Sequence, residues 1–319
     1  YNISESLEPF WAEYVSEASG RDPLAIQNSS VVIYSKLIAG ITNVTNRIRY
    51  NGFYCWLFDL ILKNTTKRNS LVEQIKYIRR GELLIAFIMA ENYEKETGVS
   101  GRDYATNNLN AKINLKKGAD LEYKDKNKLY WQNPSGIFGQ YFKTVTRDLN
   151  LINHPQKDLN IYTLTSKGQK LAAAFQNNLS KGTAKLFWDS IYKGSIVSSE
   201  LRELICFAIH LIPNNSEESE IYKSLLIDQD DRKIETTYHR RNSIFLILEF
   251  MKQEGKAIKK PTEAFLKYNF RKNLNNKLTP NDTSIGWFLY EINEILHIAF
   301  EYFHTCLLFS IEKFPTKLY

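Results

Sequence analysis

Three residues near the middle of the chain have the spacing of a metal-dependent nuclease site. Asp120 and Glu122 lie two positions apart, and Lys124 follows two positions later. In such enzymes the carboxylates bind Mg²⁺ while the lysine assists the attacking water. The segment lacks a flanking apolar strand and an upstream aspartate in a matching context. We therefore interpret the spacing as a coincidence in a highly charged stretch and keep a nuclease as a remote alternative.

Other residue types that could support catalysis or metal binding lack partners in the sequence. His297 and His304 share one face of a predicted helix, but no third ligand recurs with them. Cys55, Cys206 and Cys306 are widely separated within apolar helical patterns, which is typical of core residues in a reducing cytoplasm. The chain also lacks a P-loop motif and a nucleophile-elbow motif. We expect no metal, no cofactor and a cytoplasmic, non-enzymatic protein.

Two arginines, Arg47 and Arg49, enter a strongly apolar segment that we expect to be buried. One interpretation is a pair of guanidinium groups that faces an anion. The other is that they form ion pairs with buried carboxylates such as Asp59 or Glu82, because a buried arginine is normally paired. The second interpretation is the one we favour.

The order of predicted elements in residues 136–176 gives the clearest indication of a function. Ile137, Tyr141, Val145 and Leu149 recur about one helical turn apart, so the segment is predicted to be a helix with one apolar stripe. Its other sides are basic and rich in hydroxyl groups. They carry Lys143, Thr144, Thr146, Arg147 and Asn150.

A short β-hairpin is predicted to follow this helix. Apolar residues at 151–152 and 159–165 flank the sequence NHPQKD at 153–158, and Asn, Pro and Asp between two short apolar runs indicate a turn. Thr165 or Ser166 can then cap a second helix, in which apolar side chains again recur at helical spacing. They are Leu171, Ala172 and Phe175.

This order resembles the second half of a winged helix-turn-helix, whose wing closes on the phrase Tyr162-Thr163-Leu164-Thr165-Ser166-Lys167-Gly168. Winged helices often bind duplex DNA, but they also serve as protein-protein modules, and that alternative stays open. The resemblance implies a recognition helix, a wing tip at Lys157 and a further basic residue, Lys167. The implied DNA-binding residues are Lys143, Thr144, Thr146, Arg147, Lys157 and Lys167.

The charge distribution is compatible with a polyanionic partner. The chain has a net charge of +7, but residues 104–185 hold 13 Lys and Arg against 5 Asp and Glu. Residues 232–277 hold 12 against 4, so the remaining chain is acidic. Such segregation indicates a face for duplex DNA, although solvated helix surfaces would give the same counts.

A second resemblance lies in residues 37–62 and 77–92, LIAGITNVTNRIRYNGFYCWLFDLIL and YIRRGELLIAFIMAEN. They resemble the N-terminal helical region of bacterial accessory proteins encoded beside SMC-like ATPases in anti-phage defence clusters of the Lamassu type. The resemblance implies an SMC-like ATPase and effector subunits as partners.

The predicted fold is mainly α, with an N-terminal helical region at 1–100, a basic connection and winged helix at 101–180, and a C-terminal helical bundle at 181–319. Helices are expected at 5–18, 71–90, 198–212 and 284–313, and the first of these is acidic with Leu7, Phe10, Trp11 and Tyr14 on one side. We expect no membrane partner, because glutamates interrupt the most apolar run, 287–314.

Together these features predict a DNA-binding or scaffold subunit of a bacterial anti-phage defence complex. A purely protein-interaction subunit and a winged-helix transcriptional regulator are the alternatives.

Overall fold

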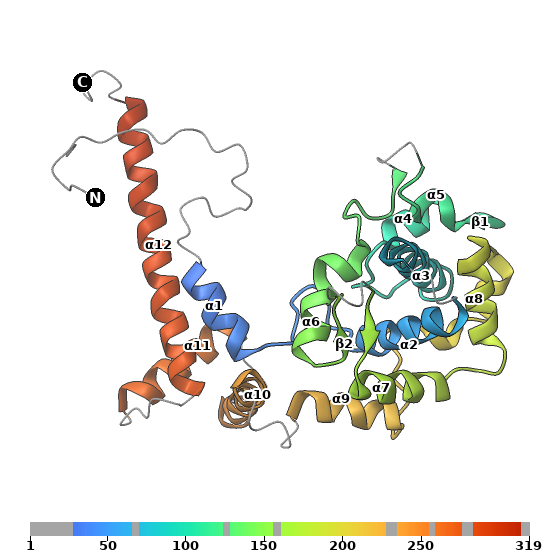
Figure 1. The fold of residues 1–319 in the computed structure, drawn as a ribbon. Helices are drawn as coiled ribbons and strands as arrows, with labels where there is room; N and C mark the ends of the chain where they lie inside the picture. Colours follow the sequence, from blue (N-terminus) through green and yellow to red (C-terminus); the bar gives the residue numbers. More distant parts are fainter. Residues whose placement is uncertain are drawn as a thin grey trace, which may run out of the picture. The chain divides into compact units, whose positions relative to one another are not determined.

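The computed structural model describes residues 28–65, 70–123, 128–155, 161–227, 235–254, 259–275 and 283–313. It is mainly helical, as predicted, with a few short strands (Figure 1). The chain forms two compact units. The central unit comprises residues 38–248, and the end unit comprises the residues up to Leu37 together with those from Glu249 onward. Among the described residues, no helix has the length and apolar character needed to cross a membrane.

Helices α2 (Arg49–Asn64) and α3 (Leu71–Asn92) form the middle of the central unit. Both are buried over most of their length, because their apolar residues cover nearly every side. Trp56 of α2 packs edge-on against Phe207 at 4.9 Å, and Phe207 stacks on Phe187 at 4.6 Å. The three regions predicted from the sequence, 1–100, 101–180 and 181–319, all contribute side chains to this one core.

Shorter elements surround α2 and α3. In chain order they are α4 (Arg102–Asn107), β1 (Lys112–Asn114), α5 (Leu115–Ala119), a π-helical turn (Phe138–Phe142), α6 (Lys143–Asp148), β2 (Ile152–Asn153), β3 (Thr163–Leu164), α7 (Ser166–Asn177), α8 (Thr183–Lys193), β4 (Ser195–Val197) and α9 (Glu217–Ile227).

The strands form two separate antiparallel pairs. Strand β1 pairs with β4, with Ile113 opposite Ile196. Strand β2 pairs with β3, with Ile152 opposite Leu164, so the predicted hairpin is present. Since β1 pairs elsewhere, the hairpin has two strands among the described residues.

The prediction of one helix over 198–212 is wrong. The segment instead contains two short 3-10 turns, Ser198–Arg202 and Ile205–Phe207. These turns bring Leu201, Leu204 and Phe207 into the core. Tight packing against α3 therefore overrides the local helical pattern.

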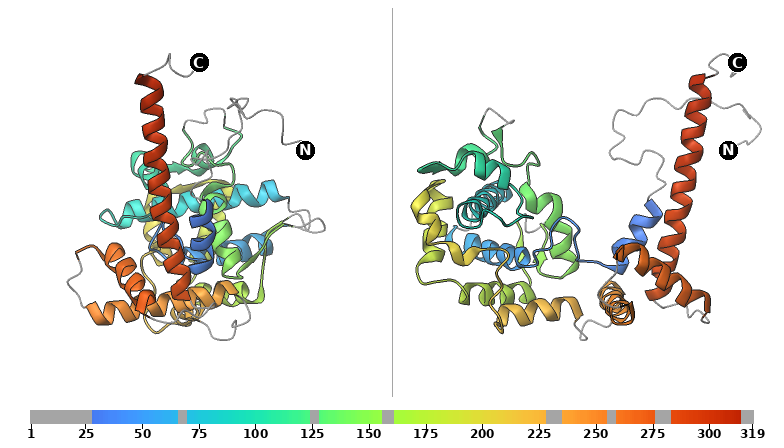
Figure 2. Two further views of the ribbon diagram at one scale, coloured as in Figure 1. Left: turned by 90° about the vertical axis from the view of Figure 1, so that its left-hand side faces the viewer. Right: turned by 180° about the vertical axis from the view of Figure 1, so that it is seen from behind.

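In the end unit, α1 (Asn28–Leu37), α11 (Pro261–Asn275) and the 31-residue α12 (Thr283–Lys313) pack together. Trp287 of α12 meets Phe265 of α11 edge-on at 5.4 Å. Helix α1 lies beside α12 in Figures 1 and 2, and the hydroxyl of Ser29 donates to the Oδ1 of Asn293 at 2.8 Å. Helix α10 (Glu235–Glu254) contains the boundary between the two units.

Candidate nucleic-acid interface

The helix that carries the predicted basic face begins with a π-helical turn. The N–H of Lys143 donates to the carbonyl oxygen of Phe138, five residues earlier, and α6 continues from Lys143. One extra residue in this turn rotates the preceding part of the helix. Phe138 and Phe142 consequently face the core, whereas Tyr141, expected in the apolar stripe, is half-buried.

The outer face of α6 is exposed and basic. Lys143, Thr144 and Arg147 are exposed, as the sequence predicts. Arg147 donates to the carboxylate of its neighbour Asp148 at 3.2 Å, but its side chain is 61% exposed. An exposed ion pair of this kind contributes little, so the guanidinium remains available to a phosphate.

Thr146 does not belong to this face. It is fully buried, and its hydroxyl donates to the carbonyl oxygens of Phe142 at 2.8 Å and Lys143 at 3.2 Å. Phe142, Val145, Thr146 and Leu149 follow the i, i+3, i+4, i+7 pattern of a buried helix face. The apolar stripe is therefore wider than predicted, and Thr146 stabilises the helix from inside.

A buried carboxylate holds the start of this helix. Glu82 of α3 accepts the backbone N–H of Ile137 at 3.0 Å and of Phe138 at 2.7 Å. It also accepts the hydroxyls of Tyr54, at 2.9 Å, and of Tyr130. Helix N-termini leave backbone N–H groups without partners, and here a side chain from the core satisfies two of them.

Burial dominates the ionisation of Glu82. Removal from water raises the pKa of its carboxyl above 4.5, and the four hydrogen bonds that it accepts partly offset the rise. The side chain is only 3% exposed. The sequence suggested Glu82 as a partner for an arginine, but its partners are two tyrosines and the start of the basic helix.

The end of α6 is fixed by a left-handed residue. Asn150 has φ +53°, and the next N–H, of Leu151, donates to the carbonyl oxygen of Thr146 at 2.8 Å. This is the Schellman pattern, in which glycine or asparagine suits the left-handed position. It turns the chain directly from the basic helix into strand β2.

The second helix packs closely against the same turn. The hydroxyl of Thr165 accepts the N–H of Gly168 at 3.0 Å and donates to the carbonyl oxygen of Asn150 at 2.7 Å, so the predicted cap is confirmed. A Cβ on Gly168 would lie 2.0 Å from the carbonyl oxygen of Leu151. Only glycine allows this approach of α7 to the start of the hairpin.

Helix α3 also holds the hairpin. The side-chain amide of Gln74 donates to the carbonyl oxygen of Tyr162 and accepts its N–H, both at 2.9 Å. Gln74 is buried, so both hydrogen bonds are shielded from water. The basic helix and the hairpin are thus anchored to one element, through Glu82 and Gln74.

His154 joins the basic group from the hairpin, and the sequence patterns did not identify it. Its ring lies 5.6 Å from that of Tyr162. Partial burial lowers the pKa of its imidazole below 6.5, and the positive charges of Lys143 and Arg147 lower it further. The sequence feature that could have identified His154 is its position directly after the first predicted strand, which follows the basic helix. The end of β2 therefore lies next to the outer face of α6.

Two of the residues predicted to contact DNA, Lys157 and Lys167, are not among the exposed residues of α6. Lys157 lies outside the described residues. Lys167, in the first turn of α7, is half-buried. The exposed predicted residues that the structure brings together are Lys143, Thr144 and Arg147.

The residues of the nuclease pattern have structural roles. The carboxylate of Asp120 is 4% exposed and binds the guanidinium of Arg80 through two hydrogen bonds, at 2.8 and 2.6 Å. Glu122 is 80% exposed at the rim of a cavity of about 280 Å³, and it lies 3.8 Å from the ammonium of Lys76. Lys124 lies outside the described residues.

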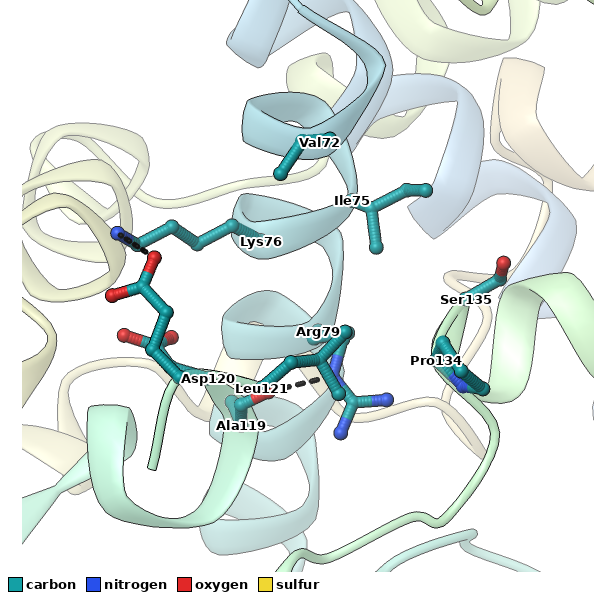
Figure 3. Close-up of a pocket in the computed structure, with 10 residues that line it drawn as sticks. Val72, Ile75, Lys76, Arg79, Ala119, Asp120, Leu121, Pro134 and Ser135 are labelled. Atoms are coloured by element: carbon teal, nitrogen blue, oxygen red, sulfur yellow. Dashed lines mark hydrogen bonds and ion pairs between the residues drawn. The ribbon is translucent and has the colours of Figure 1, made fainter. Parts of the chain in front are cut away.

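Figure 3 shows this cavity between α3 and the segment that contains Asp120. Arg79 lies at its wall and donates to the carbonyl oxygen of Ala119 at 2.6 Å. The cavity surface is mostly apolar. Because Asp120 is already neutralised by Arg80, the arrangement does not assemble the metal-binding carboxylates of a nuclease.

The arginine pair forms ion pairs, with partners other than those expected. Arg49 donates to Glu218 at 2.9 Å, and both side chains are buried. Arg47 donates to Glu96 at 2.7 Å. Asp59 instead pairs with Lys63 on α2. Glu82 instead accepts hydrogen bonds from two tyrosines and two backbone N–H groups.

His297, His304 and the three cysteines have different surroundings. His297 lies 2.9 Å from Glu301 on the same helix, whereas His304 is exposed. Cys55 is buried, while Cys206 is half-buried and Cys306 is exposed, so only the first has the environment predicted for all three. Within the described residues, no group of three potential ligands is placed to hold a metal ion.

Comparisons with protein-family models, curated proteins and solved structures find no match to this chain. A function for the chain is therefore inferred from the geometry of the basic helix and the hairpin.

Proposed function

We propose that this chain is a non-enzymatic subunit that binds duplex DNA through the outer face of α6 and the adjoining hairpin. The observation that carries the proposal is the exposed group Lys143, Thr144 and Arg147 beside His154. Cationic and hydroxyl side chains at this spacing can contact successive backbone phosphates. The hairpin beside the helix supports the interpretation of residues 136–176 as a winged helix, with α6 as its recognition helix.

The anchoring of both elements supports the same proposal. Glu82 and Gln74 connect the basic helix and the hairpin to the buried helix α3 through hydrogen bonds of 2.7–3.0 Å. A rigidly held surface loses little conformational freedom when it binds. Binding energy from the phosphates is then available for affinity.

The proposed setting is a bacterial anti-phage defence complex with an SMC-like ATPase and effector subunits, in the cytoplasm. It rests on the resemblance of residues 37–62 and 77–92 to such accessory proteins. The neighbouring genes test this proposed setting, and an adjacent gene for an SMC-like ATPase would support it. An operon of metabolic genes would instead favour a transcriptional regulator.

A charge reversal tests the DNA-facing surface. We expect Lys143→Glu/Arg147→Glu to weaken binding to duplex DNA at least about tenfold in a fluorescence anisotropy titration, because two phosphate contacts become repulsive. The matched control is Lys181→Glu/Lys193→Glu, which changes two exposed lysines at and just before α8 by the same charge. Helices α6 and α8 lie on opposite sides of the central unit in Figure 1.

Equal losses in the two variants would mean that net charge alone drives binding. No salt-sensitive binding by the wild-type chain would favour the purely protein-interaction subunit instead.

A further inference from the structure

The second half of α12 has an apolar surface that the described residues do not cover. Up to Asn293 this helix packs against α1 and α11 in the end unit. Beyond Asn293, large apolar side chains are exposed, among them Phe303 at 62% and Phe309 at 65%. Monomeric proteins rarely leave such a continuous apolar surface open, so it indicates a contact.

The exposed side chains form a stripe suited to a second helix. Leu296, Phe300, Phe303 and Leu307 follow one another at spacings of four, three and four residues, which places them on one face of α12. All four are between 45% and 62% exposed. The stripe extends over about 16 Å at a rise of about 1.5 Å per residue. Cys306 is also exposed on this half of the helix.

The N-terminal end of α1 lies near the start of this stripe. Three contacts show that α1 runs antiparallel to α12: Leu37 lies against Gly286, Tyr34 against Tyr290, and Ser29 against Asn293. The N-terminal end of α1 therefore lies at the level where the uncovered surface begins, and residues 1–27 precede it in the sequence. They lie outside the described part of the chain.

We propose that residues 5–18 dock on the exposed stripe of α12. Their sequence places Leu7, Phe10, Trp11 and Tyr14 at the i, i+3, i+4, i+7 positions of one helix face. A helix of this length is about 21 Å long, enough to cover the stripe. Residues 19–27 provide a connection that can reach about 30 Å when extended.

The covalent connection favours this segment over a second copy of the chain. A short tether gives an attached segment an effective concentration in the millimolar range. Both surfaces carry carboxylates at their margins, for example Glu8 and Glu13 on the segment and Glu301 on α12. Like charges weaken either pairing, so the contact depends on the apolar side chains.

The reactivity of Cys306 measures this contact in the full-length chain. Alkylation by a maleimide, followed peptide by peptide in a mass spectrometer, distinguishes Cys306 from the half-buried Cys206 and the buried Cys55. We expect Phe10→Asp/Trp11→Asp to raise the alkylation rate of Cys306 at least about tenfold, because the covering segment is released. Cys206 should react at its wild-type rate, and an unreactive Cys55 reports an intact core.

The matched control is Ala12→Asp/Ser16→Asp, which adds the same two charges to the opposite face of the segment. It should react at the wild-type rate, and Leu7→Asp should reproduce the effect if the double variant does not fold. Equal rates at Cys306 in wild type and Phe10→Asp/Trp11→Asp would overturn the proposal. A second outcome would also overturn it: protection of Cys306 that grows with protein concentration and persists in that variant. If light scattering then shows a dimer, a second copy of the chain covers α12.

Discussion

Among the residues, Glu82 and Arg79 of α3 are buried polar side chains that hold neighbouring segments of the chain. Glu82 accepts four hydrogen bonds and connects α2, α3 and the start of the helix that contains α6. Arg79 donates to three backbone carbonyl oxygens, those of Ala119, Trp131 and Asn133. Both residues of α3 therefore form hydrogen bonds with backbone groups of neighbouring segments.

We expect Glu82→Gln to lower the free energy of unfolding by about 2–4 kcal/mol, because the amide nitrogen of glutamine faces donors instead of accepting from them. Urea denaturation measures the loss. The exposed Glu220→Gln, whose side chain is 62% exposed, is the control and should change stability by less than about 0.5 kcal/mol.

The difference between wild type and Glu82→Gln should also depend on pH. Burial raises the folded pKa of Glu82 above the unfolded value of 4.5, so the folded chain binds this proton more tightly. The resulting stability is fully present below pH 4.5 and is lost as the pH rises through the raised pKa. The difference should therefore be largest at low pH and shrink toward neutrality, and a constant difference would contradict this assignment.

At the scale of elements, α3 organises the candidate interface. Its residues hold the start of the basic helix and Tyr162, which directly precedes strand β3. Arg80 joins Asp120 to the last turn of α8 through the carbonyl oxygens of Ile191 and Tyr192. The close approach of α7 to Leu151 completes the arrangement. The spatial relation of α6 to the hairpin thus depends on contacts from several elements.

Gly168→Ala tests the close packing of α7. The new Cβ would meet the carbonyl oxygen of Leu151 at 2.0 Å, and a backbone atom cannot move aside as a flexible side chain can. We expect a loss of about 2–4 kcal/mol in the free energy of unfolding. Ser166→Ala, on the exposed side of the same turn, should cost less than about 0.5 kcal/mol. Equal stabilities of the two variants would show that α7 is free to shift.

Local signals in the sequence predicted the elements of this region better than their connections. The helix, the hairpin and the cap at Thr165 follow from periodicity and turn residues within about ten positions. The partners of Glu82 and Arg49 lie 28–169 positions away, so no local pattern could identify them. The π-helical turn was missed because one extra residue changes the phase of the apolar stripe without changing its composition.

At the scale of the whole molecule, charge is segregated. The basic window 104–185 lies within the central unit, and its Asp120 is buried against Arg80, so that carboxylate does not offset the exposed lysines. The end unit contributes α12, whose second half exposes large apolar side chains. The two units therefore present different chemistry: the central unit is suited to a polyanion, and the end unit is suited to an apolar segment.

The salt dependence of DNA binding tests the central claim most directly. Each phosphate contact contributes about 0.9 to the slope of log K against log salt concentration for duplex DNA. Neutral Lys143→Gln/Arg147→Gln should therefore reduce the steepness of that slope by about two relative to wild type, whereas Lys181→Gln/Lys193→Gln should leave it unchanged. An unchanged slope in Lys143→Gln/Arg147→Gln would contradict the assignment of α6 as the DNA-binding surface.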